Sequence, residues 1–536
     1  MRKRLWRLLG GGLGVFSAGM IGCSAPKASP KAVPPSPTPN VLSRTNPNIV
    51  EEDEVHIVER FPKDQYIRVD DRHIRNPLIS APVEFYKEDE KYYYVFSYKR
   101  NAEADAIQAM LHPSPTPAPP PPGSTPTPAG PSPSDFEDLT PPRVSGRLRL
   151  EAVTQSGLPD NGLWRASFVV ADMNGDGIPD IVSPPPRLGP GGLYVWIGDG
   201  KGHFSRWPMQ YVENGKLDPS FSADYGAVAV GDIDGDGKLD IVSASHGFGL
   251  VSLFGDGKGT FRVVRTGLPN RDFSSQAVVL AKAGGEGKLD IITSTDTLGD
   301  NSASQDQLRV YLYKGKQGWE YKRDGIPGAF YSNSLHAWDF DGDGKADILT
   351  GCHLIGGLTL LWKNLGNGTF APIRFPEVEI YAYHFATVPG TFGKSRAPAF
   401  ADAYYMFNNT PPARATGITL YSLEQGKWVR HRVWRKKEGK SAQFALAMGD
   451  LDGDGLDDIV FPDSELNRLR IFLQRPDGTF AEIAENQEPV LDSSPQCVRL
   501  VDLDGDGRLD IVLSKTAVSY RPEDRGGWSV YLNRAK

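Results

Sequence analysis

The fold is decided by the stretch Asp232-Ile233-Asp234-Gly235-Asp236-Gly237-Lys238-Leu239-Asp240, which is followed by Ile241-Val242. Carboxylates at its positions 1, 3, 5 and 9 and a backbone carbonyl at position 7 can wrap oxygens around a hard cation. The glycine at position 6 permits a sharp turn with positive φ. An EF-hand would continue as a helix with an acid at position 12, whereas Ser243 stands there and Ile241-Val242 favour a strand. The stretch therefore predicts a calcium loop between two β-strands.

This loop recurs along the chain, and five copies keep a complete ligand set. The predicted ligands, with the seventh residue of each set acting through its carbonyl, are Asp172, Asn174, Asp176, Ile178 and Asp180; Asp232, Asp234, Asp236, Lys238 and Asp240; Asp339, Asp341, Asp343, Lys345 and Asp347; Asp450, Asp452, Asp454, Leu456 and Asp458; and Asp502, Asp504, Asp506, Arg508 and Asp510. We therefore expect about five Ca²⁺ sites.

Two reduced copies fill the remaining gaps in the series. The third loop begins with Lys282, whose ammonium we expect near Glu286 and Asp290 in place of an ion. The fifth loop, from Thr391, keeps its position but none of its ligand carboxylates. Seven loop starts spaced 50 to 60 residues apart lie in the range of propeller blades or solenoid repeats.

Each repeat has the same internal order of short strands. An apolar run precedes the loop, Ile-Val or a similar pair follows it, and a glycine-led alternating strand and a short aromatic strand come next. Four short strands without helical periodicity predict a propeller blade. The last repeat stops after its third strand, and Arg147–Ala152 resembles the missing fourth strand, so the N-terminal strand can close a ring. The fold class is therefore an all-β, seven-bladed β-propeller of four-stranded blades with N-terminal strand closure.

The pattern Asp-x-Asp-Gly-Asp-Gly-x-x-Asp-Ile-Val, followed by Gly-Asp-Gly-x-Gly-x-Phe, resembles the FG-GAP/VCBS repeat family, which includes the propellers of integrin α chains. The resemblance covers residues 146–536 and implies a calcium-binding propeller. It leaves the function open, because such repeats occur in adhesion proteins, lectins, polysaccharide lyases and envelope proteins.

The first residues read as an export signal. A basic start and a short apolar run lead to Met20-Ile21-Gly22-Cys23, which resembles a bacterial lipobox. The resemblance implies that Cys23 is lipidated, and Ser24 after it favours the outer membrane; the alternative is an ordinary signal peptide. The expected division is a signal peptide at 1–23, a Pro-rich tether at 24–48, a small α+β segment at 49–112, a Pro-rich linker at 113–143 and the propeller at 144–536.

The charge pattern excludes one class of partner. The formal net charge is −7, much of it in the loops, and no broad basic face suggests nucleic acid. The fifth blade carries a local basic strip at 427–437 and an aromatic stretch, from which Tyr404, Tyr405, Phe407, Arg432 and Arg435 are candidate ligand contacts. The alternatives are edge protection by charge and aromatic packing onto neighbouring blades.

The expected function is that of a calcium-stabilised envelope lipoprotein that presents its propeller to an envelope or extracellular protein or to a polysaccharide, without catalysis. Loops that join strands 2 and 3, and the connections between blades, face away from the calcium loops and include the long insert from Pro208 to Asp224. The alternative is a polysaccharide lyase or another carbohydrate-active enzyme.

Overall fold

The computed structural model describes residues 137–535 and parts of residues 49–98. Within these ranges the residues not described are 53–55, 63–66, 69–72, 76–82, 85–86, 89–90, 165–166, 188–190, 271–272, 285–286, 296–307, 324, 327–331, 333, 352–359, 374–381, 407–414, 438, 440–444 and 517–524. Residues 49–98 belong to one compact unit and the remaining described residues to another. The segments expected to be a signal peptide and a tether lie outside the described residues.

The smaller unit contains only short strands in its described part. A sheet of four strands has the order β1-β2-β7-β6, and a sheet of three has the order β3-β4-β5. Residues 87–88 and 92–98 lie in antiparallel strands, in which Lys87 pairs with Tyr94. The strands are β1 (Ile49–Glu52), β2 (His56–Pro62), β3 (Ile67–Arg68), β4 (His73–Arg75), β5 (Val83–Glu84), β6 (Lys87–Glu88) and β7 (Tyr92–Tyr98).

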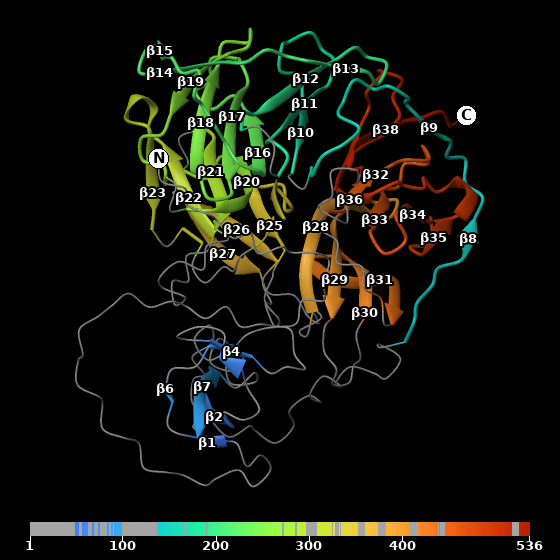
Figure 1. The fold of residues 1–536 in the computed structure, drawn as a ribbon. Coiled ribbons are helices and arrows are strands. Elements are labelled where there is room, and N and C mark those ends of the chain that lie inside the picture. Colours follow the sequence, from blue (N-terminus) through green and yellow to red (C-terminus); the bar gives the residue numbers. More distant parts are fainter. Residues whose placement is uncertain are drawn as a thin grey trace. The chain divides into compact units, whose positions relative to one another are not determined.

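The larger unit is the predicted seven-bladed propeller, with its sheets arranged in a ring (Figure 1). Blade 1 is β10 (Val169–Ala171), β11 (Asp180–Ser183), β12 (Tyr194–Gly198) and β13 (Phe204–Arg206); blade 2 is β16 (Gly226–Gly231), β17 (Asp240–Ser245), β18 (Gly249–Gly255) and β19 (Thr260–Val264); blade 3 is β20 (Ser275–Ala281), β21 (Asp290–Thr295), β22 (Leu308–Tyr313) and β23 (Trp319–Lys322); blade 4 is β24 (Leu335–Trp338), β25 (Asp347–Thr350), β26 (Leu361–Gly366) and β27 (Thr369–Ile373). Blade 5 is β28 (Ala382–Phe392), β29 (Ala397–Met406), β30 (Ala415–Glu424) and β31 (Lys427–Lys437); blade 6 is β32 (Ala447–Gly449), β33 (Asp458–Asp463), β34 (Arg468–Gln474) and β35 (Phe480–Ile483); blade 7 is β36 (Ser494–Val501), β37 (Asp510–Thr516) and β38 (Gly527–Asn533), completed by β9 (Leu150–Ala152).

The ring closes as the sequence predicts. Strand β9 pairs antiparallel with β38, with Ala152 opposite Tyr531 and Leu150 opposite Asn533. Just before it, β8 (Arg143–Val144) adds a parallel strand to the outer edge of blade 6. Ordered pairing therefore begins slightly before residue 144, inside the segment expected to be a linker.

Blade 2 carries the long insert on its outer edge. Strand β14 (Gln210–Glu213) pairs in parallel with β19, and β15 (Lys216–Leu217) pairs with β14, so this sheet has six strands. The insert is thus held by backbone hydrogen bonds to the blade.

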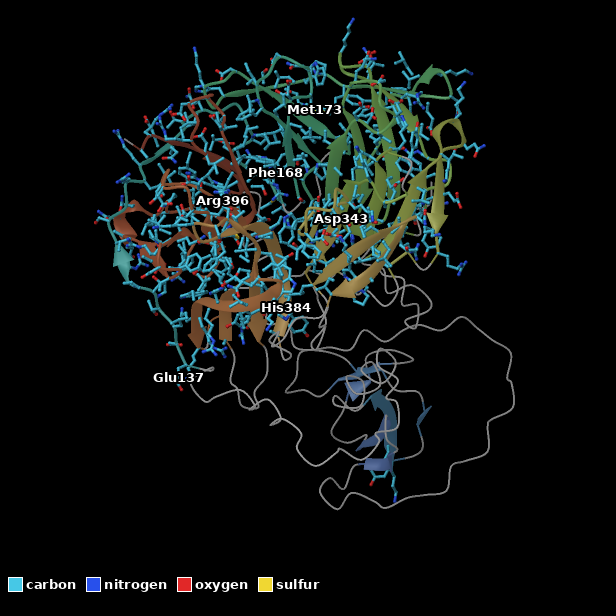
Figure 2. The ribbon with its side chains drawn as sticks, turned by 180° about the vertical axis from the view of Figure 1, so that it is seen from behind. Glu137, Phe168, Met173, Asp343, His384 and Arg396 are labelled. Atoms are coloured by element: carbon cyan, nitrogen blue, oxygen red, sulfur yellow. The ribbon has the colours of Figure 1, made fainter. Side chains whose placement is uncertain are left out.

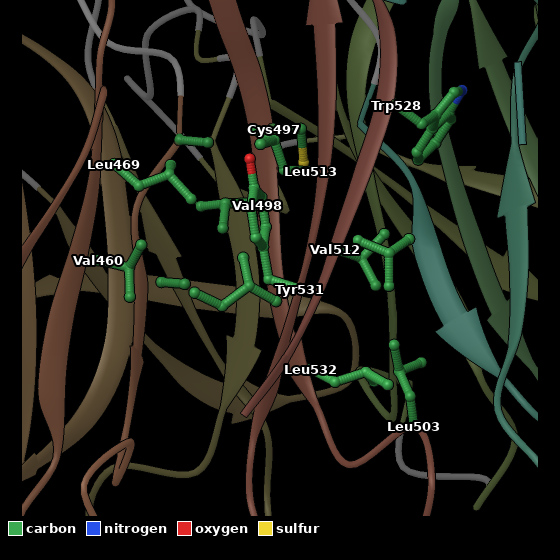
Figure 3. Packing of buried hydrophobic residues seen from close by; sticks show 14 of the residues in the cluster. Val460, Leu469, Cys497, Val498, Leu503, Val512, Leu513, Trp528, Tyr531 and Leu532 are labelled. Carbon is green, nitrogen blue, oxygen red and sulfur yellow. The ribbon is translucent and has the colours of Figure 1, made fainter. Parts of the chain in front are cut away.

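Apolar packing between blades forms the core. Strands such as β33 and β37 are buried along their whole length, so β-branched and aromatic side chains suit both of their faces. One cluster joins blades 6, 7 and 1, and Figure 3 shows Val460 and Leu469 of blade 6 in it together with Val498 and Tyr531 of blade 7.

Aromatic rings lock the closing seam between the last and first blades. Trp528 of β38 lies 5.4 Å from Trp164, 5.5 Å from Trp196 and 4.8 Å from Phe168, measured between ring centroids. Trp196 belongs to β12 of blade 1, and Trp164 and Phe168 lie just before β10. These contacts bind the ends of the propeller chain to each other.

Replacing Trp528 tests this seam. Trp528 is only 6% exposed, so we expect Trp528→Ala to lower the free energy of unfolding by about 3–5 kcal/mol through lost burial and a new cavity. Denaturant unfolding measures the loss. Leu217→Ala, at a side chain 67% exposed, is the control and should change stability by less than about 0.5 kcal/mol. Equal effects of the two changes on the free energy of unfolding would contradict the proposed contribution of the closing seam to stability.

Candidate metal centres

The carboxylate of the first aspartate in each complete loop accepts hydrogen bonds from backbone N–H groups of the turn. One oxygen of Asp232 accepts the Gly235 N–H at 2.7 Å, and the other accepts the Gly237 N–H at 3.0 Å. Both glycines have positive φ, 80° and 82°, which explains why glycine stands at these positions. The loops at Asp172, Asp450 and Asp502 repeat these two hydrogen bonds.

The ninth aspartate ties the loop to the blade. One oxygen of Asp240 accepts the Ile233 N–H inside the loop at 2.9 Å, and the other accepts the Gly255 N–H at the end of β18, also at 2.9 Å. Asp180, Asp458 and Asp510 accept the same pair of hydrogen bonds. Each of these side chains is at most 1% exposed. The ninth aspartate is therefore a buried anchor between loop and third strand, as well as a candidate ligand.

Carboxylates converge at four of the loops. Oxygens lie within 4.8 Å of one another in the sets Asp232, Asp234, Asp240; Asp339, Asp341, Asp347; Asp450, Asp452, Asp458; and Asp502, Asp504, Asp510. The first loop has Asn174 in its third position, so its donor set includes an amide oxygen.

Three of these loops also contain a buried carboxylate oxygen that has no hydrogen-bond partner in the part of the chain that the structure describes. These atoms are Oδ1 of Asp234 and Oδ1 of Asp504, at the third ligand position, and Oδ2 of Asp347, at the ninth. Leaving such an oxygen buried and unpaired is costly. A set of several carboxylate oxygens with unpaired members fits a hard cation such as Ca²⁺.

Burial without a cation disfavours the charged form of the ninth aspartates. Desolvation raises the pKa of Asp458 to about 8 and that of Asp240 to about 7, against the lowering effect of backbone hydrogen bonds; nearby loop aspartates raise it further. A bound cation would instead favour the charged form of these carboxylates.

The third loop keeps the anchor without the ligand set. Asp290 accepts the N–H groups of Ala283 and Gly284 with one oxygen and that of Tyr313 with the other. Glu286 lies outside the described residues, so the expected position of the Lys282 ammonium beside it stays a prediction.

The fifth loop is held by the neighbouring blade. Asp457, from the loop of blade 6, accepts the Thr391 N–H at 2.7 Å and its hydroxyl at 2.9 Å. Arg396, labelled in Figure 2, donates to the Gly455 carbonyl at 2.9 Å and lies 3.4 Å from Asp457. Contacts between blades thus order a loop that has lost its carboxylates.

Three of the residues expected to contact a ligand on blade 5 are buried instead. Tyr404 is 4% exposed, Tyr405 is 7% exposed and Arg435 is 4% exposed. The side chains of Tyr404 and Arg435 contact each other, with 3.4 Å between the phenol oxygen and a guanidinium nitrogen. These residues do not form the expected contact surface, because Tyr404 lies on an inner strand of the blade and Arg435, on the outer strand, is covered by Tyr404 and by the chain around Leu139. Arg432 is exposed, and Phe407 lies outside the described residues.

The basic strip on β31 is partly covered by the chain that precedes the propeller. Leu139 forms a β-bridge with Arg435, and Glu137, labelled in Figure 2, accepts a hydrogen bond from the Lys437 ammonium at 2.6 Å. Lys436 pairs with Glu465 at 3.1 Å. These contacts support the alternative of edge protection for this part of the strip.

A cavity that residue patterns did not single out lies at the insert of blade 2. Its volume is about 490 Å³, and its lining is Asp218, Ser220, Phe221, Ser222, Phe248, Leu250, Arg265, Leu268, Pro269 and Asn270. The length of the Pro208 to Asp224 insert was the available signal, but no sequence pattern shows which residues such an insert encloses.

Comparisons with known proteins agree with this architecture. The FG-GAP-like repeat family matches residues 187–243, 232–293 and 450–513. No curated protein sequence matches the chain. Solved structures that match the chain include the V. cholerae biofilm matrix protein Bap1, with 13% identity, a TM-score of 0.43 and coverage of 72% of this chain and 91% of that one. Another is a Penicillium chrysogenum alpha-L-arabinanase complexed with arabinobiose, with 11% identity, a TM-score of 0.37 and coverage of 74% and 98%. The chain is therefore a seven-bladed β-propeller that contains three FG-GAP-like repeats.

Proposed function

We propose that this protein is a calcium-stabilised binding module of the bacterial cell envelope, which recognises a protein or polysaccharide on the face opposite its calcium loops. The observation that carries the proposal is that the two faces of the propeller are built differently. One face holds loops fixed by buried aspartates, and the other holds a cavity built by an insert that the blade itself does not need.

The calcium part rests on the donor sets. Residues that would hold the ion are the first, third, fifth and ninth members of each complete loop, together with the seventh carbonyl. When bound, Ca²⁺ would supply positive charge to the converging carboxylates. The anchoring hydrogen bonds of Asp180, Asp240, Asp458 and Asp510 hold one ligand of each loop in place without the ion.

The binding part rests on the cavity at the insert. Tyr211 and Phe221 stack with 3.9 Å between ring centroids, and the Arg265 guanidinium lies 5.7 Å from the Phe221 ring. Arg265 also approaches Glu213 at 3.4 Å. These contacts fix the insert against blade 2 before any ligand arrives, and preformed sites of this size suit small ligands or part of a larger one.

The cavity lining combines two kinds of contact. Phe248 is half-buried and offers an aromatic surface, while Arg265 and Asn270 are exposed polar side chains at the same opening. Aromatic rings beside hydrogen-bonding side chains suit a sugar ring or a protein side chain at an interface.

The envelope part rests on the N-terminal sequence. Acylation at Cys23 would anchor the chain, and the Pro-rich segments at 24–48 and 113–136 would extend it from the membrane. Within the described residues, no helix is long and apolar enough to cross a membrane.

A carbohydrate-active enzyme, such as a polysaccharide lyase, is the alternative function. Incubation of the purified protein with a panel of polysaccharides separates the two, because a lyase would release unsaturated products that absorb in the ultraviolet. Binding without product supports the binding module, and product formation replaces it with the enzyme.

Calcium removal is the first test of the metal proposal. EDTA should lower the melting temperature and added Ca²⁺ should restore it, since each site contributes about 2.7 kcal/mol at a free Ca²⁺ concentration 100 times its Kd. Asp234→Asn should reduce the calcium-dependent shift. Asp477→Asn, at an exposed turn aspartate outside the loops, is the matched control and should leave the shift unchanged. A melting curve that ignores EDTA would reject structural calcium.

A pH series on the EDTA-treated protein tests the buried carboxylates. Because the pKa of Asp458 is about 8 in the folded state and about 4 in the unfolded chain, the folded state binds more protons between these values. Stability should therefore fall as the pH rises from about 6 to about 8. Asp458→Asn should flatten this dependence, and saturating Ca²⁺ should suppress it. Rising stability across this window in the calcium-free protein would contradict the assignment.

Capture experiments test the proposed binding face. The full chain without its signal is used to retain partners from envelope extract and to probe an oligosaccharide array. We expect Phe248→Ala combined with Arg265→Ala to reduce retention at least about tenfold, because both line the cavity. Lys216→Ala, on the same insert but outside the cavity lining, is the control. Unchanged binding by the double variant would place recognition elsewhere.

Lipid anchoring is tested in cells. Cys23→Ser should move the protein from the membrane fraction to the soluble fraction, because the acyl chains supply the anchoring energy. Metabolic labelling with a fatty acid analogue should mark the parent and not the variant. Membrane retention of the unlabelled variant would show another anchor.

A further inference from the structure

One position in the third strand of each blade lies directly beside the calcium loop. This position immediately precedes the third-strand residue whose backbone N–H donates to the ninth loop aspartate. The side chain at this position therefore begins next to that buried aspartate. In the other five blades that keep this aspartate the residue is apolar: Ile197, Phe254, Leu312, Leu473 and Leu532. In blade 4 the residue at this position is Lys363. It follows Trp362, and Trp362 pairs with Ile348 of the second strand.

The Lys363 ammonium lies among the carboxylates of the fourth loop. Its Nζ is 2.5 Å from Asp341 and 2.7 Å from Asp343, and it is 3.9 Å from Asp347. The lysine side chain is 20% exposed and Asp347 is fully buried. Charge-assisted hydrogen bonds in such a partly dry setting are stronger than those between neutral groups.

We propose that Lys363 is the resident cation of the fourth loop, so that blade 4 is stabilised without calcium although its ligand carboxylates are all present. This inference rests on the proposed calcium binding of the other complete loops. An incoming Ca²⁺ must displace the ammonium, break two ion-paired hydrogen bonds and then tolerate a nearby positive charge.

The inference divides the ring into two arcs. Blades 3, 4 and 5 are consecutive, and in each of them groups of the protein take the place of a cation. These groups are the backbone N–H groups around Asp290 in blade 3, the Lys363 ammonium in blade 4, and, at the blade 5 loop, Asp457 of blade 6 together with Arg396. Blades 6, 7, 1 and 2 are also consecutive, because β9 closes blade 7 beside blade 1. Calcium is then confined to the arc that contains the closing seam.

Native mass spectrometry and calorimetric titration with Ca²⁺ on the full chain without its signal count the ions. Five complete loops less the fourth predict four tightly bound ions in the parent. Lys363→Leu, which installs the residue type of the other blades, should bind one more, because Asp347 Oδ2 is already buried without a hydrogen-bond partner in the described structure.

Two further variants make the test specific to this position. Lys258→Leu is the control, because Lys258 is an exposed lysine in the turn after β18 that belongs to no ligand set, and its loss should not change the count. Ile197→Lys places an ammonium at the equivalent, half-buried position of blade 1 and should remove one ion. Thermal melts of each variant confirm that it is folded.

The outcomes separate the two levels of proposal. A parent that binds no Ca²⁺ overturns calcium binding itself. A parent that fills all five complete loops, or a folded Lys363→Leu variant that gains no ion, leaves calcium binding standing and overturns the role of Lys363. Gain with Lys363→Leu and loss with Ile197→Lys support it.

Discussion

The double hydrogen bond of the ninth loop aspartate is the constraint on which the blades depend. Each of its oxygens accepts one N–H, one from the loop and one from the end of the third strand. A single buried side chain thus fixes the turn, the register of strands 2 and 3 and one oxygen of the cation site. The same group is costly to bury as an anion, which links folding to whatever supplies the opposite charge.

The blades satisfy that requirement in different ways while keeping the same backbone. Where the carboxylate set is complete and the residue before the third-strand N–H donor is apolar, a divalent cation is the fitting partner. Where ligands are missing, backbone N–H groups or a residue of the next blade take over. The blade geometry therefore survives the loss of a metal loop, because the inter-blade packing of apolar residues remains.

Most of the fold could be predicted from the sequence, since the loop motif is rigid and its spacing repeats. Closure by Leu150–Ala152 was predictable because the last repeat lacks its fourth strand. The burial of Tyr404 and Arg435 was not, because an alternating strand reads the same whether its second face meets solvent or another blade. The role of the neighbouring Asp457 in holding Thr391 was also hidden, since it joins residues 66 positions apart. The cavity at the insert depends on side chains from three separate segments, which no local pattern connects.

Closure by β9 has a consequence for the time course of folding. The pairing of Ala152 with Tyr531 joins residues almost 400 positions apart, so the chain must restrict a very long loop before this contact forms. Such non-local contacts are slow to form. A ribosome-bound chain cannot complete blade 7 until its final strand emerges. The finished ring is therefore a late product of biogenesis.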